Sequence, residues 1–362
     1  MKRLRPILIL ASLLMLAANA AAQISLTPPP AEKPAEGKPA TKKETAKAKP
    51  LAPARKPPAP SRAPNPEPPP APPAATVIPA PAPDNPNADL VYGAYQRGLY
   101  KTAFDLAMPR AQAGDTKAMT MLGELYANAM GVKRDYAKSI DWYKRASDGG
   151  DREAMFALAM LRLGGRGGPV DREAAVKLLA SSAKLGEPKA AYNLALLYLD
   201  GQTLPQDLKR AAELLRLAAD AGNPEAQYAL ATFYKEGTGV EKDVEKSVRL
   251  LQAASLADNL DAEVEYAIAL FNGTGTPKNQ AAAVALLRKA ARQNSAIAQN
   301  RLARVLVSGT GVPMDKIEGL KWHLVAKTVG KGDPELDEAL AQLSPEDRAK
   351  VEAAARRWLG TK

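Results

Sequence analysis

A period of 36 residues runs without insertion from Asp115 to Gly330 in this chain of 362 residues. Six blocks follow one another, at residues 115–150, 151–186, 187–222, 223–258, 259–294 and 295–330. Self-similarity of this length is typical of solenoids, in which each unit buries its apolar face only against neighbouring units. The period therefore predicts a stack of repeats rather than a domain with one central core.

Each block is predicted to form two antiparallel helices, so the fold class is an all-α solenoid. The first helix begins at a column of helix-capping residues, which reads Asp115, Asp151, Glu187, Asn223, Asn259 and Ser295. The second helix begins at another such column, which reads Asp135, Asp171, Asp207, Asp243, Asn279 and Asp315. Within the first helix, Ala226, Leu230 and Tyr234 recur four residues apart and share one face. In the second helix, pairs such as Leu250-Leu251 are predicted to face inward.

Glycines lie between the two helices of the blocks, as in the Gly237-Thr238-Gly239 turn. Glycine pairs also occur in phosphate-binding loops, but such a loop follows a strand and continues into a Gly-Lys-Ser/Thr motif. Neither condition is met here, so the glycines are interpreted as structural, at turns that need a positive φ. The blocks close with residues that tolerate the same conformation, namely Gly150, Gly186, Gly222, Asp258, Asn294 and Gly330.

The first 22 residues have the pattern of a secretory signal peptide. A basic start with Lys2, Arg3 and Arg5 precedes an apolar stretch over residues 7–18, and small residues then allow cleavage after Ala20 or after Ala22. An uncleaved anchor is the alternative, although the stretch is shorter than the roughly 20 residues of a membrane span. The mature protein is therefore predicted to be periplasmic or secreted, with no later transmembrane segment.

Residues 23–88 hold 21 of the 31 prolines, mixed with alanine, lysine and glutamate. A segment with so little to bury is predicted to be a disordered linker. The folded part begins at residue 89, with a shortened capping repeat over 89–114 before the six repeats of 115–330. Residues 331–362 are predicted to form capping helices, because a solenoid needs polar-backed ends.

Composition excludes several kinds of site. The chain has no cysteine and a single histidine, His323, so thiolate chemistry and a zinc site with two imidazoles are excluded, and no metal or cofactor is expected. The formal charge of +11 is spread thinly. Residues 23–88 hold nine basic against five acidic residues, and residues 89–362 hold 38 basic against 34 acidic residues, so the folded part is only mildly basic. This argues against nucleic-acid binding. His323 lies in the inward column of the last block, where packing and a pH-sensing role are both open.

The blocks resemble Sel1-like repeats, which are related to tetratricopeptide repeats. The resemblance is carried by "AMTMLGELY", "GVKRDYAKSIDWYKRASDGG" and "AQYALATFYKEGTGVEKD", and it covers about residues 90–330. It implies a non-catalytic adaptor that binds a protein partner along a concave face. Some exported members resemble regulators that restrain a membrane sensor kinase controlling exopolysaccharide production.

The prediction that follows is an exported scaffold that binds an envelope protein, with an inner-membrane sensor kinase as one possible partner. A cell-wall-associated spacer and a glycan hydrolase with paired carboxylates are the alternatives. In related repeats the first helix lines the concave face. On that analogy the candidate partner-binding residues are Gln227, Lys235, Glu263 and Gln299.

Overall fold

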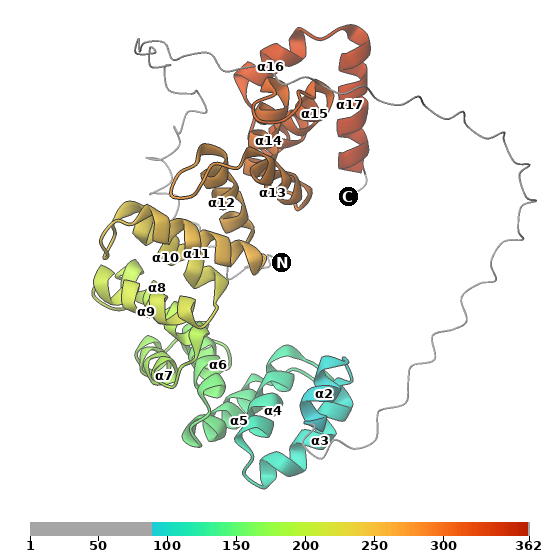
Figure 1. Cartoon of the computed structure of the whole chain (residues 1–362). Coiled ribbons are helices and arrows are strands. Elements are labelled where there is room, and N and C mark those ends of the chain that lie inside the picture. The colour runs from blue at the N-terminus through green and yellow to red at the C-terminus, as the bar shows by residue number, and fades with distance from the viewer. Residues whose placement is uncertain (1–88, 361–362) are drawn as a thin grey trace, which may run out of the picture. The chain divides into compact units, whose positions relative to one another are not determined.

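The computed structural model describes residues 89–360, and the predicted signal peptide and linker lie outside this range. All regular structure in residues 89–360 is helical, in sixteen helices. From α2 to α16 each helix packs against the next along the chain (Figure 1), and the strongest contacts join the two helices of one block. The prediction of an all-α solenoid is confirmed.

The twelve helices of the six repeats begin and end close to the predicted positions. The first helices are α4 (Thr116–Asn128), α6 (Arg152–Leu163), α8 (Pro188–Asp200), α10 (Pro224–Glu236), α12 (Leu260–Asn272) and α14 (Ala296–Ser308). The second helices are α5 (Tyr136–Asp148), α7 (Arg172–Lys184), α9 (Leu208–Asp220), α11 (Val244–Leu256), α13 (Gln280–Arg292) and α15 (Lys316–Lys327). Before them lie α2 (Leu90–Gln96) and α3 (Tyr100–Gln112), and after them α16 (Pro334–Ala341) and α17 (Pro345–Gly360).

Both predicted capping columns cap helices. The side chain at each of these twelve positions accepts a hydrogen bond from a backbone N–H in the first turn of its helix. Glu187 also acts as a cap, although its bond to the Lys189 amide is long at 3.4 Å. A cap of this kind stabilises a helix by about 1 kcal/mol. The chain therefore begins a new helix at the same place in every repeat.

Small side chains allow the helices to pack closely. One column of the first helix is alanine in every repeat and is at most 2% exposed, at Ala118, Ala154, Ala190, Ala226, Ala262 and Ala298. The residue five positions later is glycine in the first repeat and alanine in the others, and Gly123 lies so close to Tyr143 that an added Cβ would be 2.6 Å from its ring. The core thus lies between helices of neighbouring layers, which explains the low aromatic content of 5%.

The loop between the two helices is closed by the same backbone hydrogen bond in each repeat. The amide of the second cap donates to a carbonyl nine residues earlier, as from Asp243 to Tyr234 at 2.8 Å. The loop glycines adopt the predicted positive φ, which is 81° at Gly237 and 66° at Gly239. The third repeat has Thr203 at the second glycine position without a positive φ, yet its loop closes with a bond of 3.2 Å from the Asp207 amide.

The second loop glycine also contacts the preceding repeat. A Cβ added to Gly239 would lie 2.3 Å from the carbonyl oxygen of Leu208, at the start of the preceding second helix. Gly275 approaches Val244 in the same way, at 2.8 Å. Glycine is therefore required for close approach between repeats as well as for turn conformation.

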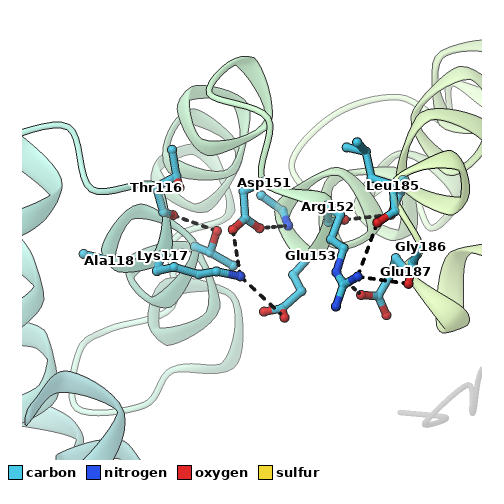
Figure 2. Close-up of polar contacts among 12 residues, drawn as sticks. Thr116, Lys117, Ala118, Asp151, Arg152, Glu153, Leu185, Gly186 and Glu187 are labelled. Carbon is cyan, nitrogen blue, oxygen red and sulfur yellow. Dashed lines mark hydrogen bonds and ion pairs between the residues drawn. The ribbon is translucent and has the colours of Figure 1, made fainter. Parts of the chain in front are cut away.

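Polar side chains join the first two repeats to the units that follow them (Figure 2). The ammonium group of Lys117 lies 3.2 Å from the Asp151 carboxylate and 3.7 Å from that of Glu153. The Arg152 guanidinium donates to the carbonyls of Leu185 and Gly186, at the end of its own repeat, and lies 3.6 Å from the carboxylate of Glu187, which begins the next repeat. Arg152 thus lies at a helix C-terminus, where the helix dipole favours a cation, whereas Lys117 is held by the carboxylates at a helix N-terminus.

The C-terminal helix α17 packs on α15, the last repeat helix. The rings of Trp322 and Trp358 meet edge to face with centroids 5.0 Å apart, and the ammonium of Lys321 lies 3.8 Å from the Trp322 centroid. Val351 and Ala355 of α17 are buried. Within residues 89–360, no helix has the length and apolar character to span a membrane.

Candidate partner-binding surface

One face of the first helices is only partly covered by the second helices and the adjacent repeats. It consists of the residues at the fifth, sixth and ninth positions of each first helix. In the four middle repeats the large apolar or weakly polar side chains that are half-buried or exposed on this face are Phe156, Met160, Tyr192, Leu196, Tyr228, Thr232 and Ile268. We call this set the first-helix face. It continues across four consecutive repeats, so an elongated partner can contact several units at once.

Two tyrosines occupy equivalent positions in neighbouring repeats and carry polar groups on this face. Burial, followed by the charge of Glu225, raises the pKa of Tyr192 to about 12. Burial also raises the pKa of Tyr228, with smaller effects from Glu265 and Asp261. Both phenols are therefore neutral near pH 7 and can donate or accept hydrogen bonds.

Two acidic residues of the fifth repeat, Asp261 and Glu265, act through their charges on Tyr228 of the fourth repeat. Asp261 and Glu265 are one turn apart on α12, and Glu265 accepts a hydrogen bond of 2.9 Å from Lys235 on α10. Asp261 is exposed as a residue, but partial burial of its carboxyl group, followed by the charge of Glu265, raises its pKa. A side chain that brings a positive charge to this place would therefore be stabilised by both carboxylates.

The four residues predicted from the sequence fall into two different environments. Lys235 is half-buried beside the first-helix face, where it pairs with Glu265. Glu263 and Gln299 are 1% and 2% exposed, so the expectation that they are surface residues is corrected by their burial between repeats. Gln227 is half-buried in the same column, and partner binding by these residues stays a prediction.

The contacts of these polar side chains explain why they lie in the interior. The side-chain amides of Gln227 and Gln299 donate to the carbonyls of Ala219 and Ala291, at 3.2 and 3.0 Å. Both carbonyls lie in the last turn of the preceding second helix, where backbone acceptors lack partners within the helix. Glu263 instead lies 2.8 Å from the ammonium of Lys289. Gln227 and Gln299 thus join neighbouring repeats, and Glu263 joins the two helices of its own repeat.

His323 is fully buried, as its inward column predicts. Its Nε2 atom lies 2.9 Å from a carboxylate oxygen of Asp337 on α16. Within the described residues, no group of three or more histidine, aspartate or glutamate side chains has the arrangement of a metal site.

The first-helix face was missed in the sequence because its residues differ from repeat to repeat. A signal was available in one column of the aligned blocks, which reads Thr120, Phe156, Tyr192, Tyr228, Val264 and Asn300. The large side chains of this column lie two residues after a buried alanine and, at Phe156, Tyr192 and Tyr228, two residues before a buried leucine, and all but Val264 are half-buried. Polarity instead points to Gln227, Glu263 and Gln299, one residue earlier, where the side chains are half-buried or buried.

Repeated helix pairs, each packed only on its neighbours, define the chain as an α-solenoid of the tetratricopeptide-like class. The Sel1 repeat model matches residues 116–151, 152–187, 188–223, 224–259, 260–295 and 296–327. The chain belongs to the Sel1 repeat family. A comparison with curated proteins found no match.

Two solved structures are similar to the chain. A Sel1 repeat protein from Oxalobacter formigenes is 25% identical, with a TM-score of 0.59, and the match covers 66% of this chain and 98% of that one. A protective antigen present in uropathogenic Escherichia coli strains, which displays an SLR fold, is 24% identical with a TM-score of 0.51. That match covers 72% of this chain and 64% of the antigen, and it supports the fold alone.

Proposed function

We propose that this protein is an exported, non-catalytic scaffold that binds an envelope protein along its first-helix face. A Sel1 repeat array is suited to protein–protein interaction, because it presents side chains from many helices at regular spacing. The observation that carries the proposal is the row of half-exposed aromatic and aliphatic side chains across four repeats. Contiguous apolar surface that is open to solvent marks sites of protein contact.

The binding energy is expected to come from a few anchors. Tyrosine is enriched among residues whose truncation weakens an interface most, because its ring offers a large contact area and its hydroxyl a hydrogen bond. Tyr192, Leu196 and Tyr228 are the anchors that we propose. The signal-peptide pattern supports an envelope location, and a membrane sensor kinase is the narrower partner that the family resemblance implies.

Site-specific crosslinking in cells tests this function. A photoreactive amino acid is placed at Leu196 on α8 or, as a control, at Leu217 on α9, which is 47% exposed. We expect the Leu196 position to capture one envelope protein that the Leu217 position does not. Equal capture from both positions, or capture only from α9, would exclude the first-helix face as the binding surface.

The export step has its own test. N-terminal sequencing of the mature protein from a periplasmic fraction should give a chain that begins at Ala21 or Gln23. A chain that keeps Met1 and sediments with membranes would support the uncleaved anchor instead.

A further inference from the structure

Charged side chains are uncommon at the positions that form the first-helix face. Among the fifth, sixth and ninth residues of the six first helices, the charged ones are Glu124, Glu265, Arg301 and Arg304. The two carboxylates each bind a side chain of the preceding unit. Glu124 accepts a hydrogen bond of 2.8 Å from the Tyr95 hydroxyl on α2, and Glu265 lies 2.9 Å from the Lys235 ammonium on α10. Both acidic charges at these positions are therefore compensated across a junction between units.

The two arginines of α14 differ from each other in this respect. Arg304 pairs with Asp333, which is 2% exposed, and lies 3.8 Å from the Glu335 carboxylate. Arg301, one turn earlier, is half-buried and forms no hydrogen bond or ion pair within residues 89–360. The charge of Asp333 also acts on Arg301, but the Asp333 carboxylate is held by Arg304. A half-buried arginine without a partner is unusual, because the charged group has lost water without gaining a counter-ion.

The register of the repeats explains why Arg301 lacks a partner. Glu265 and Arg301 are equivalent residues of the fifth and sixth repeats, and the residue that meets Glu265 from the preceding repeat is Lys235. The equivalent of Lys235 in the fifth repeat is Phe271, which is 7% exposed and carries no charge. The unit before Arg301 thus supplies an apolar residue at the place of a counter-ion. Burial accordingly lowers the pKa of Arg301.

Aliphatic side chains continue the first-helix face up to Arg301 and past it. Ile268 occupies the ninth position of α12 in the fifth repeat and is half-buried. Ile297 lies one turn before Arg301 on α14 and is 50% exposed. A segment bound along this face therefore has apolar contacts in both repeats, and an acidic residue within it can reach the guanidinium. Arginine binds a carboxylate through two parallel N–H···O hydrogen bonds, which also fix its orientation.

We propose that Arg301 is a binding site for an aspartate or glutamate side chain of the protein partner. This inference rests on the proposed function and adds to the chemistry of the bound segment. The apolar residues of that segment contact the anchors in the third and fourth repeats, and its acidic residue pairs with Arg301 in the sixth. A basic residue is disfavoured at the same place, since it would meet the like charges of Arg301 and Arg304. The pairing sets the direction in which the segment lies on the array.

Peptide selection on the full chain tests the inference. A displayed library of random 12-residue peptides is selected on the immobilised protein, and the enriched peptides are synthesised with an amidated C-terminus, which removes the terminal carboxylate. Affinity is measured by fluorescence anisotropy for the wild type, for Arg301→Gln and for Arg216→Gln. The last variant removes an exposed arginine of α9 that forms no ion pair within the described residues, and it serves as the matched control.

The expected result is enrichment of peptides with an acidic residue at a fixed distance from apolar ones. Their affinity should fall about tenfold in Arg301→Gln, which corresponds to about 1.4 kcal/mol, and less than about twofold in the control. Replacement of the acidic residue by its amide in the peptide should cause the same loss on the wild type and no further loss on Arg301→Gln. Arg301→Glu should in turn bind peptides in which lysine replaces the acidic residue.

The other outcomes separate this inference from the proposed function. Peptides that lose affinity with Tyr192→Ala/Tyr228→Ala but not with Arg301→Gln would overturn the inference and leave the first-helix face as the binding surface. Peptides that depend on Arg301 without containing an acidic residue would also overturn it. Peptides that respond to none of these variants, or no enrichment at all, would overturn both. Thermal unfolding shows whether each variant is folded, and the amide substitution in the peptide decides the question on the wild type.

Discussion

The Nε2 atom of His323 lies 2.9 Å from Oδ1 of Asp337, which joins the last repeat helix to α16. Asp337 also accepts a hydrogen bond of 2.6 Å from Lys327. One half-buried carboxylate thus ties the first C-terminal helix to two side chains on α15. The arrangement makes the attachment of this end of the array sensitive to acid.

The pH dependence of stability follows from Asp337. Hydrogen bonds from Lys327, then from His323, lower its pKa in the folded state. A carboxylate with a lowered pKa stabilises the fold fully above its unfolded pKa of about 3.9, and this contribution is lost as the pH falls through the folded value. The difference in Tm between the wild type and Asp337→Asn should therefore be constant from about pH 7 to 5 and shrink below about pH 4. A difference that grows on acidification would contradict this assignment.

Removal of the Trp358 ring should loosen the C-terminal helix. Trp358 meets Trp322 edge to face, and Trp322 is 3% exposed. Loss of a half-buried ring and of an aromatic pair should reduce the free energy of unfolding by about 2–3 kcal/mol in Trp358→Ala. Urea denaturation measures the change. The control is Leu256→Ala on an 80% exposed side chain, which should change stability by less than about 0.5 kcal/mol.

Alanine substitutions at two glycines measure separately the free-energy cost of a left-handed backbone conformation and that of a close contact between repeats. Gly222 has φ of 83° and open space around its missing Cβ, whereas Gly239 has φ of 66° and the Leu208 carbonyl at 2.3 Å. Gly222→Ala should cost about 1 kcal/mol for the left-handed conformation alone. Gly239→Ala should cost about 3 kcal/mol, because the neighbouring helix must also move. Equal losses in the free energy of unfolding, measured by urea denaturation, would show that the contact between repeats does not contribute to stability.

Asp151 combines a helix cap with an ion pair, and two substitutions distinguish them. Its carboxylate accepts from the Ala154 amide at 2.8 Å and lies near Lys117 (Figure 2). Asp151→Asn keeps an acceptor for the cap and should cost less than about 1 kcal/mol, since Lys117 is largely exposed. Asp151→Ala removes the cap as well and should cost about 1–2 kcal/mol. The two variants are compared by thermal unfolding at low and at high salt, where only the Lys117 contribution should weaken.

The repeat geometry could be predicted from the sequence, because it depends on residues that act within a few positions of one another. Caps such as Asp243, turns such as Gly237 and alanines such as Ala226 each act within a few residues, and all recur at 36-residue intervals. Burial of Glu263 and Gln299 could not be inferred from residue type, since both are polar. Their column contains Met119, Met155 and Ala191 in other repeats, which did indicate an interior position. The first-helix face depends on which helix surface the neighbouring repeats leave uncovered, and this requires the assembled array.

The contact of each second loop glycine with the previous repeat has a consequence for the length of the array. An insertion within the loop would push Gly239 or Gly275 away from the helix on which it rests, so single residues cannot be added there without cost to the junction. A whole unit can be removed instead. Deletion of residues 223–258 would join Gly222 to Asn259, two residues that already hold the positions of a block end and a block start. Such arrays are therefore expected to gain or lose length by one complete helix pair at a time.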